Sequence, residues 1–174
     1  MKLTQVKGNP VSDATPLQRP MLAADVDALV AAEVECFPED PWSAEAFREI
    51  LSLPVFHGVV LEEDGTLIGY LVAYEVLDEG ELLNIAILPA QRGRGLGRML
   101  LGQWLAGLLQ KGFRKVFLDV RENNIPAIRL YESFGFRAVG LRKGYYSSGE
   151  DALEMMLDLE GIEGSNERDE DRDE

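Results

Sequence analysis

The feature that most constrains the fold is a glycine-rich segment, Arg92–Gly97, which lies between two stretches of different periodicity. The preceding residues, Leu82–Pro89, are apolar and β-prone, as is typical of a buried strand. In the residues that follow, large apolar side chains recur every four positions, as on one face of a helix: Leu96, Leu100, Trp104 and Leu108. The sequence therefore predicts a strand, a tight turn and a helix. The first N–H groups and the dipole of such a helix together form a site for an anion.

Three arginines gather at this turn in a chain whose net charge is −14: Arg92, Arg94 and Arg98. Glycine lets a backbone approach a ligand where a Cβ would collide with it, so the ligand is predicted to carry phosphate. The spacing excludes two common phosphate motifs. The Walker A motif ends in Gly-Lys-Ser/Thr, which is absent, and the dinucleotide fingerprint requires a third glycine where Arg98 stands.

The pattern that fits is Arg92-x-x-Gly95-x-Gly97, which resembles the acetyl-CoA pyrophosphate loop of the GCN5-related N-acetyltransferase (GNAT) superfamily. A second segment, Leu118–Phe136, resembles the last conserved block of that superfamily, in which a strand ends, an Asn opens a helix and Leu-Tyr-x-x-x-Gly-Phe follows. The local chemistry agrees, because Asn124 is a favourable N-cap.

Six further segments make the chain similar to one branch, the RimI-type ribosomal-protein alanine N-acetyltransferases: Phe37-Pro38, Pro41-Trp42-Ser43, Val76–Glu79, Asn84–Ala86, Leu118–Arg121 and Tyr145-Tyr146. The resemblance covers residues 18 to 159. It implies an α/β (α+β) GNAT fold, a mixed central sheet of about seven strands flanked by about four helices. It also implies that the strand ending at Leu88 splays from the strand ending at Val120, with the pantetheine arm in the gap.

The resemblance further implies which residues bind the cosubstrate acetyl-CoA. Backbone groups of Ile85, Ala86 and Ile87 would bind the acetyl and pantetheine groups and stabilise the oxyanion, and these residues can also be strand core. Asn124 would orient the pantetheine amide or the thioester region, besides capping its helix. No metal is expected. The pyrophosphate would be held by the turn and the first helical residues, namely Arg92, Gly93, Arg94, Gly95, Leu96, Gly97 and Arg98.

Acetyl transfer requires that the amine lose a proton, that the oxyanion find hydrogen-bond donors and that the leaving thiolate receive a proton. The resemblance implies that Tyr131 is the general acid; the alternative is a core aromatic residue. It implies that Asp119 is the base, at a position where the branch carries Glu. Because Asp is shorter by one methylene, a water would bridge the amine and the carboxylate. The alternative for Asp119 is a strand-end carboxylate paired with an arginine.

Three aromatic residues are predicted to form the acceptor side of the site. Tyr145 and Tyr146 lie in a loop that would cover the incoming peptide, and Trp42 would form a wall; a surface pair and a core ring are the alternatives. His57, the only His, is expected in the sheet. Cys36 is expected to be a buried thiol and not an acetyl-carrying nucleophile, because no His lies near it in sequence.

The chain of 174 residues, 46% hydrophobic and 28% charged, suits one globular domain. We expect a loose N-terminal extension over 1–15, the GNAT domain over 16–160 and an acidic disordered tail over 161–174. Within the domain, a helix near Ala24–Cys36 is expected to bury one face made of Val26, Leu29, Val30 and Val34.

Composition also limits the partners and the compartment. The single Cys excludes a disulfide framework and fits a reducing cytoplasm. The sequence shows no signal peptide and no apolar run of membrane length, so a cytoplasmic protein without a membrane partner is predicted. The acidic net charge argues against nucleic acid as a partner. A monomer or weak dimer is expected.

Three functions are compatible with these features. The leading hypothesis is an enzyme that acetylates a protein N-terminal α-amine, with a ribosomal protein beginning with Ala as the implied substrate, by direct attack in a ternary complex. A second hypothesis is an acetyltransferase for a small amine such as a polyamine or an antibiotic. A third is a non-catalytic acyl-CoA-binding regulatory module, which the shortened Asp119 leaves open.

Overall fold

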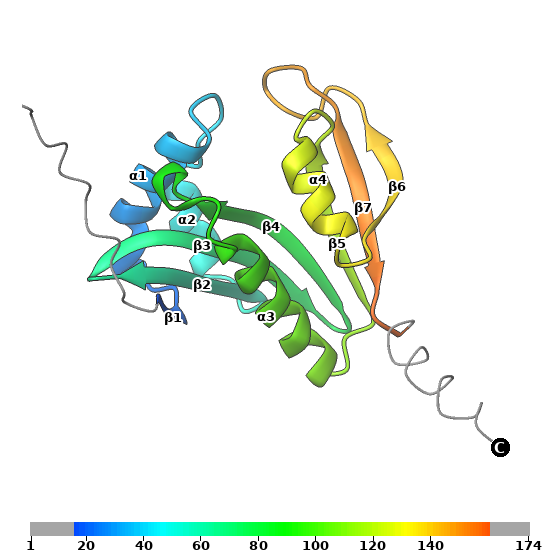
Figure 1. Cartoon of the computed structure of the whole chain (residues 1–174), viewed down its shortest axis with the longest axis horizontal. Coiled ribbons are helices and arrows are strands. Elements are labelled where there is room, and N and C mark those ends of the chain that lie inside the picture. Colours follow the sequence, from blue (N-terminus) through cyan, green and yellow to red (C-terminus); the bar gives the residue numbers. More distant parts are fainter. Residues whose placement is uncertain (1–15, 161–174) are drawn as a thin grey trace, which may run out of the picture.

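The computed structural model describes residues 16–160, which form one seven-stranded sheet with helices on both faces (Figure 1). In chain order the elements are β1 (Leu17–Pro20), the 3-10 turn η1 (Ala23–Asp25), α1 (Val26–Cys36), α2 (Ala44–Leu51), β2 (Phe56–Glu63), β3 (Thr66–Val76), β4 (Glu79–Ile87), the 3-10 turn η2 (Pro89–Gln91), α3 (Leu96–Gln110), β5 (Lys115–Arg121), α4 (Ile125–Glu132), β6 (Arg137–Arg142) and β7 (Ala152–Asp158).

The strand order is β1-β2-β3-β4-β5-β7-β6. Neighbouring strands are antiparallel, except for β4 and β5, which are parallel. This arrangement confirms the predicted mixed sheet of seven strands flanked by four helices. The expected extension over 1–15 and the acidic tail over 161–174 lie outside the described residues.

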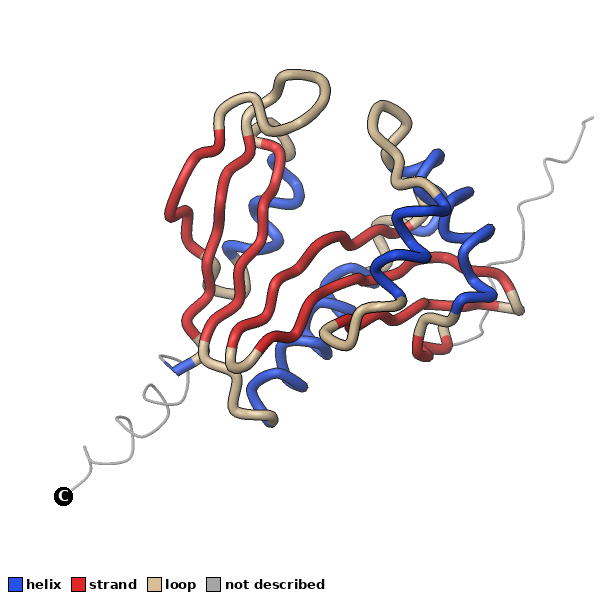
Figure 2. The backbone as a smooth tube through the Cα atoms, turned by 180° about the vertical axis from the view of Figure 1, so that it is seen from behind, coloured by secondary structure: helices blue, strands red, loops and turns tan. Residues whose placement is uncertain are grey.

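The sheet separates two hydrophobic cores. The two opposite views show helices on each of its faces (Figures 1 and 2). Helices α1 and α2 cover one face and pack around Phe47, Val60 and Tyr70. Helices α3 and α4 cover the other face and pack around Leu100 and Leu118. Strand β3 lies between β2 and β4 and is buried on both sides, which explains its almost continuous apolar sequence.

Local sequence signals set the ends of several elements. The Ser43 hydroxyl caps α2 by accepting a hydrogen bond from the Ala46 N–H group at 3.2 Å. The β2–β3 hairpin turns at Asp64 and Gly65, which both have positive φ. Helix α3 begins after Gly95, whose φ of 76° is a left-handed conformation that favours glycine.

One expectation about α1 is wrong. Val26 and Leu29 are buried, but Val34 is 55% exposed, whereas Glu33 is fully buried. Glu33 lies seven residues, close to two helical turns, after Val26 and so shares its face, whereas Val34 lies at the edge of this face. The polar partners of Glu33 come from distant strands, which sequence periodicity does not reveal.

Strands β4 and β5 separate before either of them ends. Their parallel pairing runs from Glu79 and Lys115 to Leu82 and Leu118, and it stops there. Strand β4 continues to Ile87 and remains paired with β3, while β5 remains paired with β7. The gap therefore opens inside the sheet (Figure 1), as the resemblance predicted.

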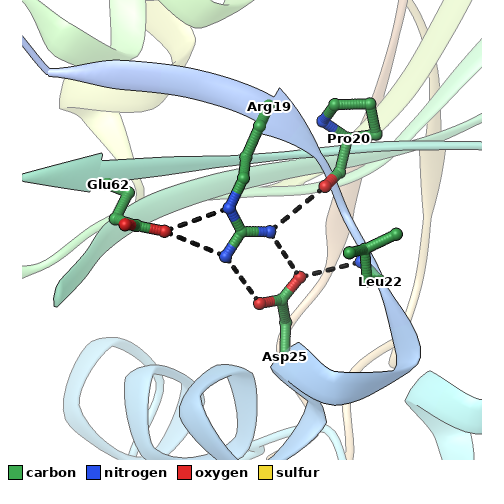
Figure 3. A network of polar contacts seen from close by, with 5 residues as sticks. All are labelled: Arg19, Pro20, Leu22, Asp25 and Glu62. Atoms are coloured by element: carbon green, nitrogen blue, oxygen red, sulfur yellow. Dashed lines mark hydrogen bonds and ion pairs between the residues drawn. The ribbon is translucent and has the colours of Figure 1, made fainter. Parts of the chain in front are cut away.

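An ion cluster fixes the first strand to the domain (Figure 3). The Arg19 guanidinium donates to both carboxylate oxygens of Asp25, at 2.8 and 2.9 Å, and to Glu62 at 3.0 Å. Asp25 also accepts the Leu22 N–H group at 2.8 Å, and its hydrogen bonds with Arg19 lower its pKa. The cluster thus joins β1, η1 and β2 through one side chain.

We predict that Arg19→Met destabilises the domain by about 2 kcal/mol, because it removes several hydrogen bonds between charged groups and leaves Asp25 without its partner. Arg48→Met is the matched control. Arg48 is exposed and meets Glu45 only at 3.8 Å, so its loss should cost about 0.5 kcal/mol or less. Urea unfolding measures both variants, and equal effects would contradict the role of the Arg19 cluster.

Candidate functional site

A cleft of about 850 Å³ fills the gap between β4 and β5. Its walls come from the ends of these strands, the α1–α2 connection, the start of α3, helix α4 and Tyr146. The α1–α2 and β6–β7 connections stand on opposite sides of the gap in both views (Figures 1 and 2). The cleft brings together most of the residues that the sequence singles out.

The start of α3 has the features of an anion site. Gly95 is the N-cap residue, and no side chain caps the helix. The first N–H groups of a helix have no acceptor within the helix, so they are available to a ligand. A Cβ at Gly93 or Gly95 would meet no atom within 4 Å, which means that open space lies beside the turn. The Leu96 side chain is core, so this residue offers the site only its backbone.

The three arginines of the turn have different surroundings. Arg92 lines the cleft, and its Nε donates to the Ile87 carbonyl at 3.0 Å. Arg98 also lines the cleft and lies over the Phe134 ring at 5.2 Å. Arg94 does not line it, because its guanidinium forms an ion pair with Glu63 at 2.7 Å. Arg94 thus joins the turn to the β2–β3 hairpin.

Backbone groups of β4 also face the gap. The Leu88 N–H group donates to the Ile68 carbonyl at 3.0 Å. Because backbone groups of successive residues in an antiparallel strand point to alternate sides, those of Ala86, two residues earlier, also bond to β3. The backbone N–H and C=O groups of Ile85 and Ile87 consequently point away from β3, toward the separated β5. The Ile87 carbonyl accepts bonds from Arg92 and from the Cys36 thiol there.

Helix α4 contributes two predicted residues to the cleft. Asn124 caps it by accepting the Ala127 N–H group at 3.3 Å, which leaves the amide NH₂ group of Asn124 to donate elsewhere. Tyr131 is buried, with its ring against Phe136 at 5.8 Å. Burial raises the pKa of Tyr131, so its hydroxyl stays protonated at neutral pH. Tyr131 is therefore both a core aromatic and a cleft residue.

Asp119 lies on β5, one residue beyond the last pair with β4. Its neighbours Leu118 and Val120 pack under α3 and α4, so the side chain of Asp119 faces the opposite side of the sheet. Oδ2 meets Arg142 at 3.4 Å, while Oδ1 is buried and has no hydrogen-bond partner within residues 16–160. Burial raises the pKa of Asp119, and the Arg142 guanidinium acts in the opposite direction.

The three predicted acceptor residues are not equivalent. Trp42 lines the cleft and packs on Phe47 at 5.5 Å, so it is both wall and core. Tyr146 lines the cleft with the Arg121 guanidinium 4.0 Å from its ring centre, and burial raises its pKa to about 12. Tyr145 is 51% exposed and lies outside the cleft lining, edge-on to Tyr146.

Sequence reasoning missed a buried polar cluster at the floor of the cleft. The Glu33 carboxylate accepts hydrogen bonds from the Tyr70 hydroxyl, from Asn84 Nδ2 at 2.8 Å and from the Trp42 N–H group at 2.8 Å. Burial raises the pKa of Glu33 to about 7, against the opposing effect of its hydrogen bonds. The available signal was a carboxylate on the apolar face of a predicted helix.

Two other residues show no catalytic arrangement. Cys36 lines the cleft, but burial raises the pKa of its thiol, which disfavours the nucleophilic thiolate. His57 pairs with Glu75 at 3.0 Å on β2 and β3 and does not line the cleft. Among residues 16–160, no three His, Cys, Asp or Glu side chains are placed to hold a metal ion, and no helix could span a membrane.

Charge is distributed unevenly along the cleft. Arg92 and Arg98 line the cleft where α3 begins, and Arg92 also shares the Ile87 carbonyl with Cys36 at the end of α1. Glu39, Asp40 and Asp119 line it from the α1–α2 connection and β5, together with Arg121, which meets Asp40 at 3.9 Å. The start of α3 thus suits an anionic ligand, and the carboxylates, which outnumber Arg121, suit a cationic one.

Comparison with known proteins agrees with this geometry. Residues 26–136 match the family model described as the Acetyltransferase (GNAT) family. The chain is 39% identical over 141 residues to the N-alpha-acetyltransferase RimI of Mycobacterium tuberculosis, which covers 78% of this chain and 87% of that protein. It is 35% identical over 122 residues to the ribosomal protein bS18-alanine N-acetyltransferase of Escherichia coli strain K12, covering 68% of this chain and 82% of that protein.

A solved structure is also similar. The crystal structure of the ribosomal-protein-S18-alanine N-acetyltransferase from Escherichia coli has a TM-score of 0.78 and 32% sequence identity, over 83% of this chain and 94% of that chain.

The raised pKa of Glu33 predicts a pH-dependent stability. A carboxyl whose pKa is higher in the folded than in the unfolded state stabilises the fold most below its ordinary value of 4.5, and this contribution is lost as the pH rises to about 7. Glu33→Gln cannot titrate. The melting temperature of the unmodified protein minus that of Glu33→Gln should therefore fall between pH 5 and pH 8. A constant difference would show that burial does not shift this carboxyl.

Proposed function

The chain belongs to the Acetyltransferase (GNAT) family, and we propose that this acetyl-CoA-dependent N-acetyltransferase modifies the N-terminal α-amine of a ribosomal protein that begins with Ala. The two relatives described above support the proposal, since one is named an N-alpha-acetyltransferase and the other a ribosomal protein bS18-alanine N-acetyltransferase. Acetylation of a ribosomal protein implies that the enzyme acts in the cytoplasm.

The observation that carries the proposal is the polarity of a cleft that passes between two strands of one sheet. The pyrophosphate of acetyl-CoA is anionic, and the uncapped N-terminus of α3 with Arg92 and Arg98 suits it. An N-terminal ammonium is cationic, and the carboxylate of Asp119, which lines the same cleft, suits that group. The thioester and the amine would therefore meet in the gap, which supplies proximity and orientation.

The chemistry of the step follows from the residues that border the gap. The ammonium gives one proton to Asp119 through a water, and the nitrogen then bonds to the thioester carbonyl carbon. The N–H group of Ile85 or Ile87 stabilises the oxyanion. When the carbon–sulfur bond breaks, the Tyr131 hydroxyl gives its proton to the sulfur, and the second proton of the amine restores that hydroxyl through solvent.

An α-amine suits this site better than a lysine side chain. The α-amine has an ordinary pKa of about 7.7–8.0, against about 10.4 for Lys, so less free energy is needed to deprotonate it. Asp119 reaches less far than a Glu and shares its carboxylate with Arg142, so it is a weak base. An easily deprotonated amine matches such a base.

Acetylation of two peptides tests the acceptor. A short basic peptide that begins with Ala should be acetylated on its α-amine, whereas the same peptide with a blocked N-terminus and a free Lys should react at least about tenfold more slowly. Mass spectrometry locates the acetyl group. Modification of Lys in preference to the α-amine, or turnover of spermidine with none of the peptide, would contradict the proposal.

Binding of CoA tests the anion site. Gly95→Val places a bulky side chain in the open space beside the turn, so affinity for CoA should fall by at least about tenfold through steric exclusion of the pyrophosphate. Gly65→Val is a matched control, because Gly65 has a similar φ of 74° and similar open surroundings but lies in the β2–β3 turn. Calorimetry should show normal CoA affinity for Gly65→Val. Equal affinities of the two variants would place the pyrophosphate elsewhere.

The pH dependence of kcat/KM tests the base. In the unmodified enzyme, kcat/KM for the peptide should rise as Asp119 loses its proton, at a pH above the ordinary 3.8 because its pKa is raised. A second rise, near 7.7–8.0, should follow the amine itself. Asp119→Asn should abolish the first rise and keep the second. A profile that keeps both rises would assign the base to another group.

A further inference from the structure

A bulge in β4 turns Asn84 toward the acceptor side of the sheet. Asn84 pairs with Val72 on β3, but the next pair is Leu82 with Ala73, so Leu83 is an extra residue. The bulge breaks the alternation along β4. As a result, Leu83 packs in the core under α1 and α2, and the side chain of Asn84 contacts Glu33 on that same side.

Asn84 and Asp119 stand on opposite sides of the gap. Leu82 and Leu118 form the last pair between β4 and β5, so Asn84 lies two residues beyond that pair on one strand and Asp119 lies one residue beyond it on the other. Both side chains are on the α1 and α2 side of the sheet, and both line the cleft. An amine that reached the gap from this side would pass between them.

The hydrogen bonds of Asn84 fix which end of its amide faces the cleft. Its Nδ2 donates to Glu33 Oε1 at 2.8 Å and to the Tyr70 hydroxyl oxygen at 3.1 Å, two acceptors that contact each other and lie on the same side of the nitrogen. Above its pKa of about 7, the Glu33 carboxylate is ionised and only accepts, which directs the NH₂ end of Asn84 toward it. No hydrogen bond to Oδ1 is present among the described residues. That oxygen is therefore available as an acceptor.

The charge of Glu33 adds to this arrangement. Its carboxylate is fully buried, and it forms no ion pair with a Lys, Arg or His side chain of residues 16–160. Its partners are neutral donors: the Tyr70 hydroxyl, the Asn84 amide and the Trp42 N–H group. When Glu33 is ionised, above its pKa of about 7, a buried carboxylate without a cation favours a cationic group in the neighbouring part of the cleft.

We propose that Asn84 Oδ1 accepts a hydrogen bond from the amine of the acceptor, opposite Asp119, and that Glu33 and Tyr70 hold the Asn84 amide in the orientation this contact needs. The inference rests on the proposed function only in that an amine binds in this cleft. Asn84 is then a direct contact of the substrate, while Glu33 and Tyr70 are positioning residues. An ammonium has three N–H groups; Asn84 would take one of them, and the water on Asp119 would take a second.

Kinetics with both substrates test the proposal. Asn84→Ala should raise KM for a basic peptide beginning with Ala by about tenfold or more, because it removes a hydrogen bond to a charged group. KM for acetyl-CoA and the calorimetric affinity for CoA should not change. Tyr70→Phe should change the same parameters by a few-fold, because the Tyr70 hydroxyl contacts both the Asn84 amide and the Glu33 carboxylate. A merely structural role would change the parameters of both substrates.

Tyr74→Phe is the matched control for Tyr70→Phe. Tyr74 lies on the same strand, packs in the same core and has no contact with Glu33 or Asn84 in the described part of the chain. Its KM for the peptide should equal that of the unmodified enzyme. Thermal unfolding confirms that each variant is folded. If a variant is unfolded at the assay temperature, Asn84→Ser, which keeps a small polar side chain, replaces Asn84→Ala.

A parallel series with spermidine separates the two proposals. If the unmodified enzyme acetylates spermidine and not the peptide, the proposed acceptor is wrong, and the effect of Asn84→Ala on KM for spermidine then decides the role of Asn84. If folded Asn84→Ala keeps KM for the acetylated amine, or raises KM for acetyl-CoA instead, the role of Asn84 is refuted while the proposed function stands.

Discussion

The parallel pairing of β4 with β5 ends at Leu82 and Leu118, and the rest of the structure depends on this early separation. Opening a sheet in its middle leaves backbone N–H and C=O groups without ladder partners, which is costly where they are buried. The protein satisfies one of them, the Ile87 carbonyl, with Arg92 and Cys36. The groups that remain face a cleft in which a substrate can use them.

The separation also lets different residues reach the gap from each face of the sheet. On one face, α3 and α4 meet the gap with an uncapped helix start, Asn124 and Tyr131. On the other face, α1 and the two long connections meet it with Glu33, Asn84 and Asp119. The anionic and the cationic substrate can therefore approach one opening from opposite sides, and neither has to displace the other.

Much of the fold could be predicted from local sequence. The turn after β4 carries glycines and arginines together, and Asn124 marks the start of α4, because turn chemistry and caps act within a few residues. The cluster around Glu33 could not be predicted in this way. Its members come from α1, β3 and β4, which are distant in sequence. Its geometry depends on a bulge at Leu83, and no local sequence pattern predicts that bulge. The Arg94–Glu63 pair, which withdraws one arginine from the cleft, likewise joins residues distant in sequence.

The central claim is that one opening in the sheet holds both substrates at once. The most direct measurement is the affinity of a compound in which CoA is joined through an acetyl bridge to the α-amine of a basic peptide beginning with Ala. If both halves occupy the same cleft, linking them should make this compound bind at least about 100-fold more tightly than CoA or the peptide alone, because the second contact becomes intramolecular. An affinity no better than that of CoA would contradict the claim.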